Sequence, residues 1–183
     1  MMAVAGPATA TSKEAAAELF HFEPDDGIPN SRLPLVFWRG RLPGEAREGA
    51  AAGALFRKNG WQGTWVSNVL PYWHFHTRGH EVLACVSGRA RIGFGGDSGI
   101  EVDVETGDAC VIPAGVGHIR LDGSGDFRMA GGYPPGQQGN IVRPGDLDDA
   151  TIAREIAALA LPATDPLSGK ADGVAAIWRE VKP

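Results

Sequence analysis

The chain has 183 residues, a length typical of one domain with a tail. It contains 26 Gly and 13 Pro residues, whereas average usage would give roughly 22 of these two types together. This excess argues against a helical bundle or a coiled coil and favours many short strands joined by tight turns. A hydrophobic fraction of 43% against a charged fraction of 21% argues against intrinsic disorder.

Charge and hydropathy argue against several partners. The net charge is -5 and Lys and Arg form no cluster, so we expect no nucleic-acid binding. No apolar run approaches the roughly 18 residues of a membrane span, and Met1–Ala10 lacks the features of a secretory signal. Two cysteines, Cys85 and Cys110, are too few for a disulfide framework. We therefore expect a cytoplasmic protein whose thiols are buried and inert.

Three helical segments are predicted. Residues 1–19 should form a flexible tail and a short helix that follows a capping box. The Ala-rich stretch 44–58 should form a second helix, inserted in the main domain. Residues 146–183 should form a third helix, over Asp148–Leu161, and a docked tail anchored by Trp178.

Residues 20–145 are predicted to form the main domain. Short β-type runs recur there, about ten residues apart in much of the segment, and the turns between them mostly contain Gly. This pattern is typical of an antiparallel sandwich or barrel. The expected strands are 20–22, 33–38, 64–67, 72–76, 81–86, 90–94, 100–104, 109–112, 118–121 and 127–130. We therefore expect an all-β domain with a few flanking helices.

Four of the five histidines lie between positions 74 and 118. His74 and His76 are two residues apart, so on a strand their imidazoles share one face. Glu81 opens the next predicted strand, and His118 follows a second tight turn. Three neutral imidazoles and one carboxylate suit a divalent transition metal, which could be Mn, Fe, Ni, Co or Zn. A metal that prefers six ligands would keep up to two positions for water, substrate or oxygen.

The spacing of these residues resembles the two motifs of the cupin superfamily. The chain has H-x-H-x4-E-x6-G at 74–88 and G-x5-P-x-G-x2-H at 107–118. Asn68 stands where the first motif usually begins with Gly, and Asp122 stands where the second usually ends with Asn. The resemblance implies a double-stranded β-helix, which is a small jelly-roll barrel. It also implies that the metal ligands, which project into the barrel mouth, are His74, His76, Glu81 and His118.

Segments beyond these motifs resemble the YjlB-like single-domain cupins. They are residues 22–39, 80–83 and 113–118. The resemblance implies a bacterial protein but leaves the reaction open, because this fold hosts many chemistries. We expect a metal-dependent enzyme acting on a small polar molecule, as an oxygenase, an isomerase or a decarboxylase. The alternative is a non-enzymatic protein that binds or senses a small molecule.

Two residues near the predicted ligands are open to two interpretations. Arg120 is two residues after His118 and shares its face, so it could contact a substrate carboxylate or phosphate, or form a surface salt bridge. Tyr72 is in phase with His74 and His76, so it could line the substrate pocket or pack in the barrel.

The remaining two histidines are not predicted to be ligands. His80 adjoins Glu81, so on a regular strand its side chain faces away from the metal. We expect His80 at the surface or just behind the ligands. His21 lies far from both motifs in the sequence and is expected at the surface or in packing contacts.

A homodimer is the expected assembly. Proteins that this chain resembles commonly pair through their sheets. Phe75, Val82 and Ala84 are candidates for an apolar outer face, and the strand predicted at 33–38 would flank them. Such a face needs a partner to cover it, and a second copy of the chain would serve.

Overall fold

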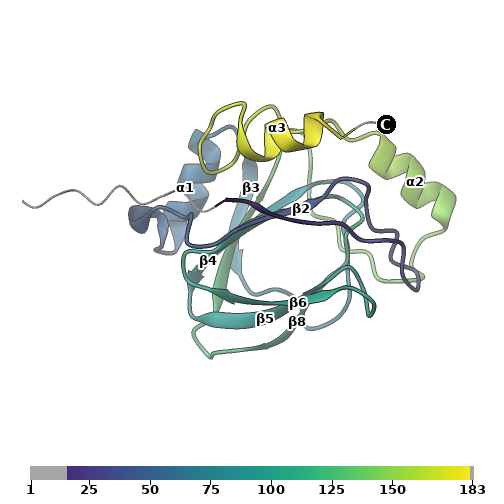
Figure 1. The fold of residues 1–183 in the computed structure, drawn as a ribbon, viewed down its shortest axis with the longest axis horizontal. Helices are drawn as coiled ribbons and strands as arrows, with labels where there is room; N and C mark the ends of the chain where they lie inside the picture. The colour runs from purple at the N-terminus through teal and green to yellow at the C-terminus, as the bar shows by residue number, and fades with distance from the viewer. Residues whose placement is uncertain (1–15, 182–183) are drawn as a thin grey trace, which may run out of the picture.

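The computed structural model describes residues 16–181, and its strands form two antiparallel sheets that face each other (Figure 1). The larger sheet contains β1 (Glu18–Phe20), β2 (Leu35–Trp38), β3 (Gln62–Ser67), β4 (Glu81–Ser87), β7 (Ala109–Ile112) and β9 (Arg128–Tyr133), in the spatial order β1-β2-β7-β4-β9-β3. The smaller sheet contains β5 (Arg89–Phe94), β6 (Ile100–Glu105) and β8 (His118–Gly123), in the order β6-β5-β8. The two sheets confirm the predicted all-β, jelly-roll fold class.

Most predicted strands are present, with small shifts at their ends. The exception is 72–76, which forms only isolated bridges at His74 and Phe75. At the start of the chain, residues 1–15 hold most of the predicted tail and helix and lie outside the described residues. Glu18 and Leu19, which the sequence assigns to the end of that helix, belong instead to β1 and pair with β2. Pairing with the free edge of β2 supplies backbone partners that a one-turn helix would lack.

The described helices are η1 (Gly44–Ala46), α1 (Ala50–Lys58), α2 (Asp149–Ala157) and α3 (Gly173–Arg179). The single helix predicted over 44–58 is thus divided, because Gly49 has φ of +38° and interrupts the helical backbone. The helix predicted over 148–161 ends early, at Ala157. Its predicted last residue, Leu161, precedes Pro162, and a residue before proline disfavours helical geometry. All helices in the described part of the chain are too short or too polar to span a membrane.

Strand β4 is buried on both faces, and its alternating side chains divide the core in two. Leu83 and Cys85 point between the sheets, into the same cluster as Ile92 of β5. Val82 and Ala84 point the other way, into a cluster that includes residues of α1 and α3. Figure 1 shows α3 lying across this outer side of the larger sheet, near β2.

This covering layer contradicts the basis of the predicted homodimer. Phe75, Val82 and Ala84 are each 0% exposed. Val82 and Ala84 lie beneath the helices, and Phe75 packs in a separate cluster with Ile152 of α2. The predicted flanking strand is β2, which lies between β1 and β7 and is also buried. The chain's own helices and loops cover these surfaces, so they give no support for a homodimer. The homodimer stays a prediction.

Trp178 of α3 anchors the C-terminal segment, as the sequence predicts. Its side chain is 0% exposed. The indole Nε1 donates a hydrogen bond of 2.9 Å to the carbonyl oxygen of Pro34. The indole ring also lies against the imidazole of His80, with 4.8 Å between the ring centroids. The tail is therefore docked on the segment before β2 and on the residue before Glu81.

We expect Trp178→Ala to lower the free energy of unfolding by about 3–5 kcal/mol, because it removes a buried aromatic ring and leaves a cavity. Trp178→Phe should cost less, since it keeps most of the packing and loses the hydrogen bond to Pro34. Urea denaturation followed by circular dichroism measures both losses. A loss below about 1 kcal/mol for Trp178→Ala would show that α3 is not part of the cooperative core.

Candidate metal centre

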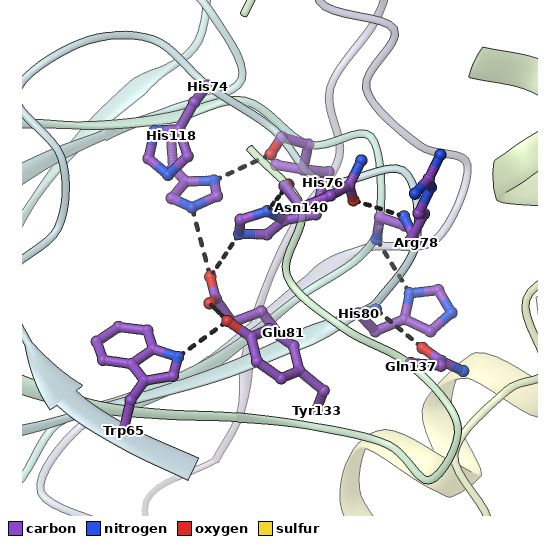
Figure 2. Close-up of polar contacts among 12 residues, drawn as sticks. Trp65, His74, His76, Arg78, His80, Glu81, His118, Tyr133, Gln137 and Asn140 are labelled. Atoms are coloured by element: carbon purple, nitrogen blue, oxygen red, sulfur yellow. Dashed lines mark hydrogen bonds and ion pairs between the residues drawn. The ribbon is translucent and has the colours of Figure 1, made fainter. Parts of the chain in front are cut away.

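Two neighbouring histidines and one from a distant part of the chain meet at the mouth of the barrel. One ring nitrogen from each of His74, His76 and His118 lies within 4.8 Å of the other two. All three side chains are buried. Figure 2 shows the three rings together on one side of the Glu81 carboxylate. The structure therefore brings together the three histidines that the sequence spacing selects.

The backbone around His74 and His76 is held by bridges rather than by a continuous strand. His74 and His118 exchange two backbone hydrogen bonds, of 3.3 Å from the His74 amide and 2.9 Å from the His118 amide. Phe75 and Val142 exchange two more, of 2.9 and 3.0 Å. This extended backbone still alternates, so His74 and His76 share one side while Phe75 points into the core. The predicted shared face is confirmed without the predicted strand.

Backbone carbonyls fix the orientation of each imidazole. A carbonyl oxygen only accepts hydrogen bonds, so an Nδ1 that bonds to one must carry the proton. In a neutral ring of this tautomer, Nε2 keeps a lone pair that can bind a metal. The three Nδ1–carbonyl contacts are His74 to Tyr72 at 3.1 Å, His76 to Asn140 at 2.5 Å and His118 to Val116 at 3.2 Å.

The Glu81 carboxylate completes the cluster. Its Oε2 lies 3.0 Å from Nε2 of His76 and 3.4 Å from Nε2 of His118. Burial alone would raise the pKa of Glu81, but the two histidines hold it below its ordinary value. Burial alone would likewise lower the pKa of His76, but Glu81 raises it above its ordinary value. A bound cation would take the place of the proton that His76 and Glu81 share.

His74 differs from His76 because it has no carboxylate beside it. Burial and the nearby His118 lower the pKa of His74 to about 3, so its ring is neutral at neutral pH. A neutral imidazole is the form that binds metals. The donor set therefore comprises three imidazole nitrogens and one ionised carboxylate oxygen, which fits a divalent transition metal.

The second oxygen of Glu81 is held by Tyr133, which is held in turn by Trp65 (Figure 2). Tyr133 Oη donates a hydrogen bond of 3.0 Å to Glu81 Oε1, and Trp65 Nε1 donates one of 2.9 Å to Tyr133 Oη. Trp65 of β3 is paired in register with Gly131 of β9. A Cβ atom at Gly131 would overlap the indole ring, so glycine is what lets Trp65 lie over β9 and reach Tyr133.

Asn140, in the connection between β9 and α2, holds the loop that carries His76. Its side-chain oxygen accepts hydrogen bonds from the amides of Thr77 and Arg78, at 3.1 and 2.9 Å. Its side-chain nitrogen donates to the Thr77 hydroxyl at 2.8 Å. Because the Asn140 carbonyl also accepts the His76 proton, one residue fixes both the ligand ring and the backbone that follows it.

Sequence reasoning missed three residues of this supporting layer. Asn140 follows no motif, so no local signal marks it. Tyr133 and Trp65 lie outside both motifs, so motif spacing does not mark them. The signal that could have found the aromatic pair is the Gly131-Gly132 dipeptide opposite Trp65, but that signal appears only once the register between β3 and β9 is known.

His80 faces away from the metal cluster, as predicted (Figure 2). The expectation of a surface position is wrong, because its side chain is buried under Trp178. Its Nδ1 accepts a hydrogen bond of 3.0 Å from the Ala114 amide, and burial lowers its pKa to about 4. His80, which directly precedes β4, is therefore a neutral ring that packs against α3. His21 is exposed, which confirms one of its two predicted positions.

A cavity of about 180 Å³ borders the cluster, and His74, His76, Glu81 and His118 all line it. Tyr72 and Arg120 are not among its lining residues. The centroids of the Tyr72 and His74 rings are 5.9 Å apart. The guanidinium of Arg143 lies over the Tyr72 ring, 3.8 Å from its centroid. Arg120 Nε donates to the Val69 carbonyl at 3.1 Å. Their contact with a substrate stays a prediction.

Both cysteines are free and buried, as the sequence predicts. Burial raises the pKa of Cys85 to about 11 and also raises that of Cys110. Thiolate is the reactive form of cysteine, so both side chains are poor nucleophiles at neutral pH. Nucleophilic chemistry at these residues is therefore disfavoured.

The two facing sheets and the buried His, His, Glu, His cluster at the barrel mouth define a cupin. The chain is 40% identical over 162 residues to the uncharacterized protein YjlB of Bacillus subtilis, across 86% of this chain and 94% of that protein. The chain therefore belongs to the YjlB family. No family model matches it.

Similar solved structures have much lower identity. Acireductone dioxygenase from Bacillus anthracis is 16% identical and matches 59% of this chain and 82% of its own, with a TM-score of 0.41. RmlC from Streptococcus suis is 12% identical and matches 93% of this chain and 95% of its own, with a TM-score of 0.40. Both TM-scores are too low to transfer a function to this chain.

We expect Asn140→Ala to weaken the affinity for a divalent metal by about 10–100-fold, because supporting hydrogen bonds orient metal-binding imidazoles. Isothermal titration with Co(II) or Zn(II) measures this loss. Gln138→Ala is the matched control, since Gln138 lies in the same connection with an exposed side chain and contacts Arg78 through its backbone. Equal affinity in Asn140→Ala and Gln138→Ala would contradict the positioning role of Asn140.

Proposed function

We propose that the chain binds one divalent transition metal through His74, His76, Glu81 and His118. The observation that carries the proposal is the shared orientation of the three imidazoles. Each Nδ1 is bound to a backbone carbonyl, and the ring nitrogens meet beside an ionised carboxylate. A cluster built this way satisfies the coordination chemistry of Mn, Fe, Ni, Co and Zn, and affinity order alone does not select among them.

A structural polar core is the competing explanation for these four residues. Buried polar groups are costly unless they have partners, so such a core normally closes around its own hydrogen bonds. Here the cluster instead lines a cavity of about 180 Å³. The opening gives a second molecule access to the same atoms, which favours a site over a closed core.

We further propose that the protein is a metal-dependent enzyme acting on a small molecule held in this cavity, as an oxygenase, an isomerase or a decarboxylase. A metal bound there would polarise an oxygen of the bound molecule or bind dioxygen. The four ligands would hold the ion, Tyr133 would orient the Glu81 carboxylate, and the cavity walls would exclude water.

The proposed location is the cytoplasm, because both thiols are free, as a reducing compartment keeps them.

A non-enzymatic binding or sensor protein would use the same cavity without turnover. To separate the two, the metal-loaded protein is screened by thermal shift against small molecules, and each hit is incubated with it and followed by mass spectrometry. Conversion of any hit that depends on the loaded metal supports the enzyme. Stabilising hits that are all recovered unchanged, with each of the five metals, support the binding protein.

Metal content tests the site directly. We expect the wild type to hold about one equivalent of metal per chain after loading and gel filtration, and His74→Ala and His118→Ala to lose most of it. His21→Ala is the matched control, because His21 is exposed and lies outside the cluster. Inductively coupled plasma mass spectrometry gives the stoichiometry. A wild type that holds no stoichiometric metal after loading with all five ions contradicts the proposal.

A further inference from the structure

The cavity beside the metal cluster is small for a ligand site. Its volume of about 180 Å³ lies below the roughly 300–1,000 Å³ of pockets for drug-sized ligands. An apolar cavity of roughly 150 Å³ is enough to hold a benzene molecule. The enclosed space therefore suits one small ring or a short branched chain.

Away from the ligands and Tyr133, the walls are mainly apolar. Val69 and Leu83 are buried, Trp65 and Leu70 are half-buried, and Ile141 is exposed. Ile141 is 54% exposed, so a molecule in the cavity would cover part of its side chain. Ser67 and Asn68 supply uncharged polar groups at the exposed rim, and Gly139 completes the lining.

The lining holds no lysine or arginine side chain. Arg78 and Arg120 are the arginines closest in the chain to the cluster. Arg78 pairs with Glu155 at 2.9 Å, and Arg120 Nε donates to the Val69 carbonyl. The acidic group of the wall is the Glu81 carboxylate, which is already paired with His76 and His118. Recognition of phosphates and multiple carboxylates normally relies on arginine or lysine donors, and none of those in residues 16–181 lines this cavity.

We infer that this site takes a small, mainly apolar molecule that carries an oxygen donor and no phosphate or second carboxylate. The inference rests on the proposed function, because it assumes that the donor reaches a metal held by the four ligands. It replaces the expected polar substrate with one whose apolar body contacts Trp65, Leu70 and Ile141. Ile141 becomes a specificity residue, because its apolar side chain lines the cavity and is not one of the four proposed metal ligands.

Four simple probes of the Co(II)-loaded protein test this inference. Benzohydroxamate and acetohydroxamate present the same oxygen donors and differ in their apolar body, while oxalate and phosphate present anionic oxygens. Each is titrated while the visible spectrum of the cobalt is recorded. We expect benzohydroxamate to bind about tenfold or more tightly than acetohydroxamate, because burying the ring removes apolar surface from water. Oxalate and phosphate should bind more weakly than benzohydroxamate.

A variant pair locates the effect. Ile141→Asn keeps the side chain near its size and makes it polar, so it should reduce the preference for benzohydroxamate several-fold and leave the cobalt content and the acetohydroxamate affinity unchanged. Leu121→Asn is the control, because Leu121 is similarly exposed, at 44%, and does not line the cavity.

The outcomes separate the inference from the proposed function. A wild type without stoichiometric cobalt overturns the metal site and with it the inference. A wild type with cobalt that binds acetohydroxamate as tightly as benzohydroxamate, that prefers oxalate or phosphate, or that binds none of the probes, overturns the inference and leaves the metal site standing. An unchanged preference in Ile141→Asn overturns the role of Ile141.

Discussion

A buried carboxylate has to be compensated, and much of this structure is arranged around that of Glu81. One oxygen faces His76 and His118, and the other accepts the proton of Tyr133. Each partner is held in turn by a further element: His76 by the carbonyl of Asn140, and Tyr133 by the indole of Trp65. Leaving a buried charge without a partner costs several kcal/mol. The loss of any one of these contacts would therefore weaken the compensation that the others provide. The connection between β9 and α2 and the edge strand β3 thereby become parts of the site.

The alternation of β4 links this site to the stability of the whole domain. Glu81, Leu83 and Cys85 face the barrel interior, while Val82 and Ala84 face the helices. A shift of one residue would exchange the two sets and place a carboxylate under α3. The docked C-terminal segment opposes such a shift, because its indole lies against the ring of the residue that precedes Glu81. Packing on the outer face of the sheet thus holds the register on which the inner face depends.

The sequence was sufficient for most strands and for the clustering of the three histidines, and insufficient for what surrounds them. Spacing carries the ligand prediction, because His74 and His76 alternate along an extended backbone whether or not it forms a regular strand. Asn140 is separated from His76 by more than sixty residues and acts through loop geometry, for which a single sequence holds no periodic signal. The predicted outer face failed for a different reason. Val82 and Ala84 are apolar because two helices cover them, and a pattern of buried residues does not say which part of the chain, or which copy, does the covering.

The direction of the hydrogen bonds around Glu81 limits the chemistry open to the site. Trp65 can only donate, so Tyr133 accepts from it and directs its own proton to Glu81. Burial and the adjacent carboxylate raise the pKa of Tyr133, so the phenol keeps this proton at neutral pH. Among the residues that line the cavity, Glu81 is then the side-chain oxygen best placed to accept a proton, and Tyr133 acts by holding it. A reaction that needs a side-chain base in addition to the proposed metal would therefore have to use this carboxylate, whose pKa is held below its ordinary value, at the expense of its proposed bond to the ion. This constraint favours reactions in which the bound molecule supplies its own acidic proton or needs none removed.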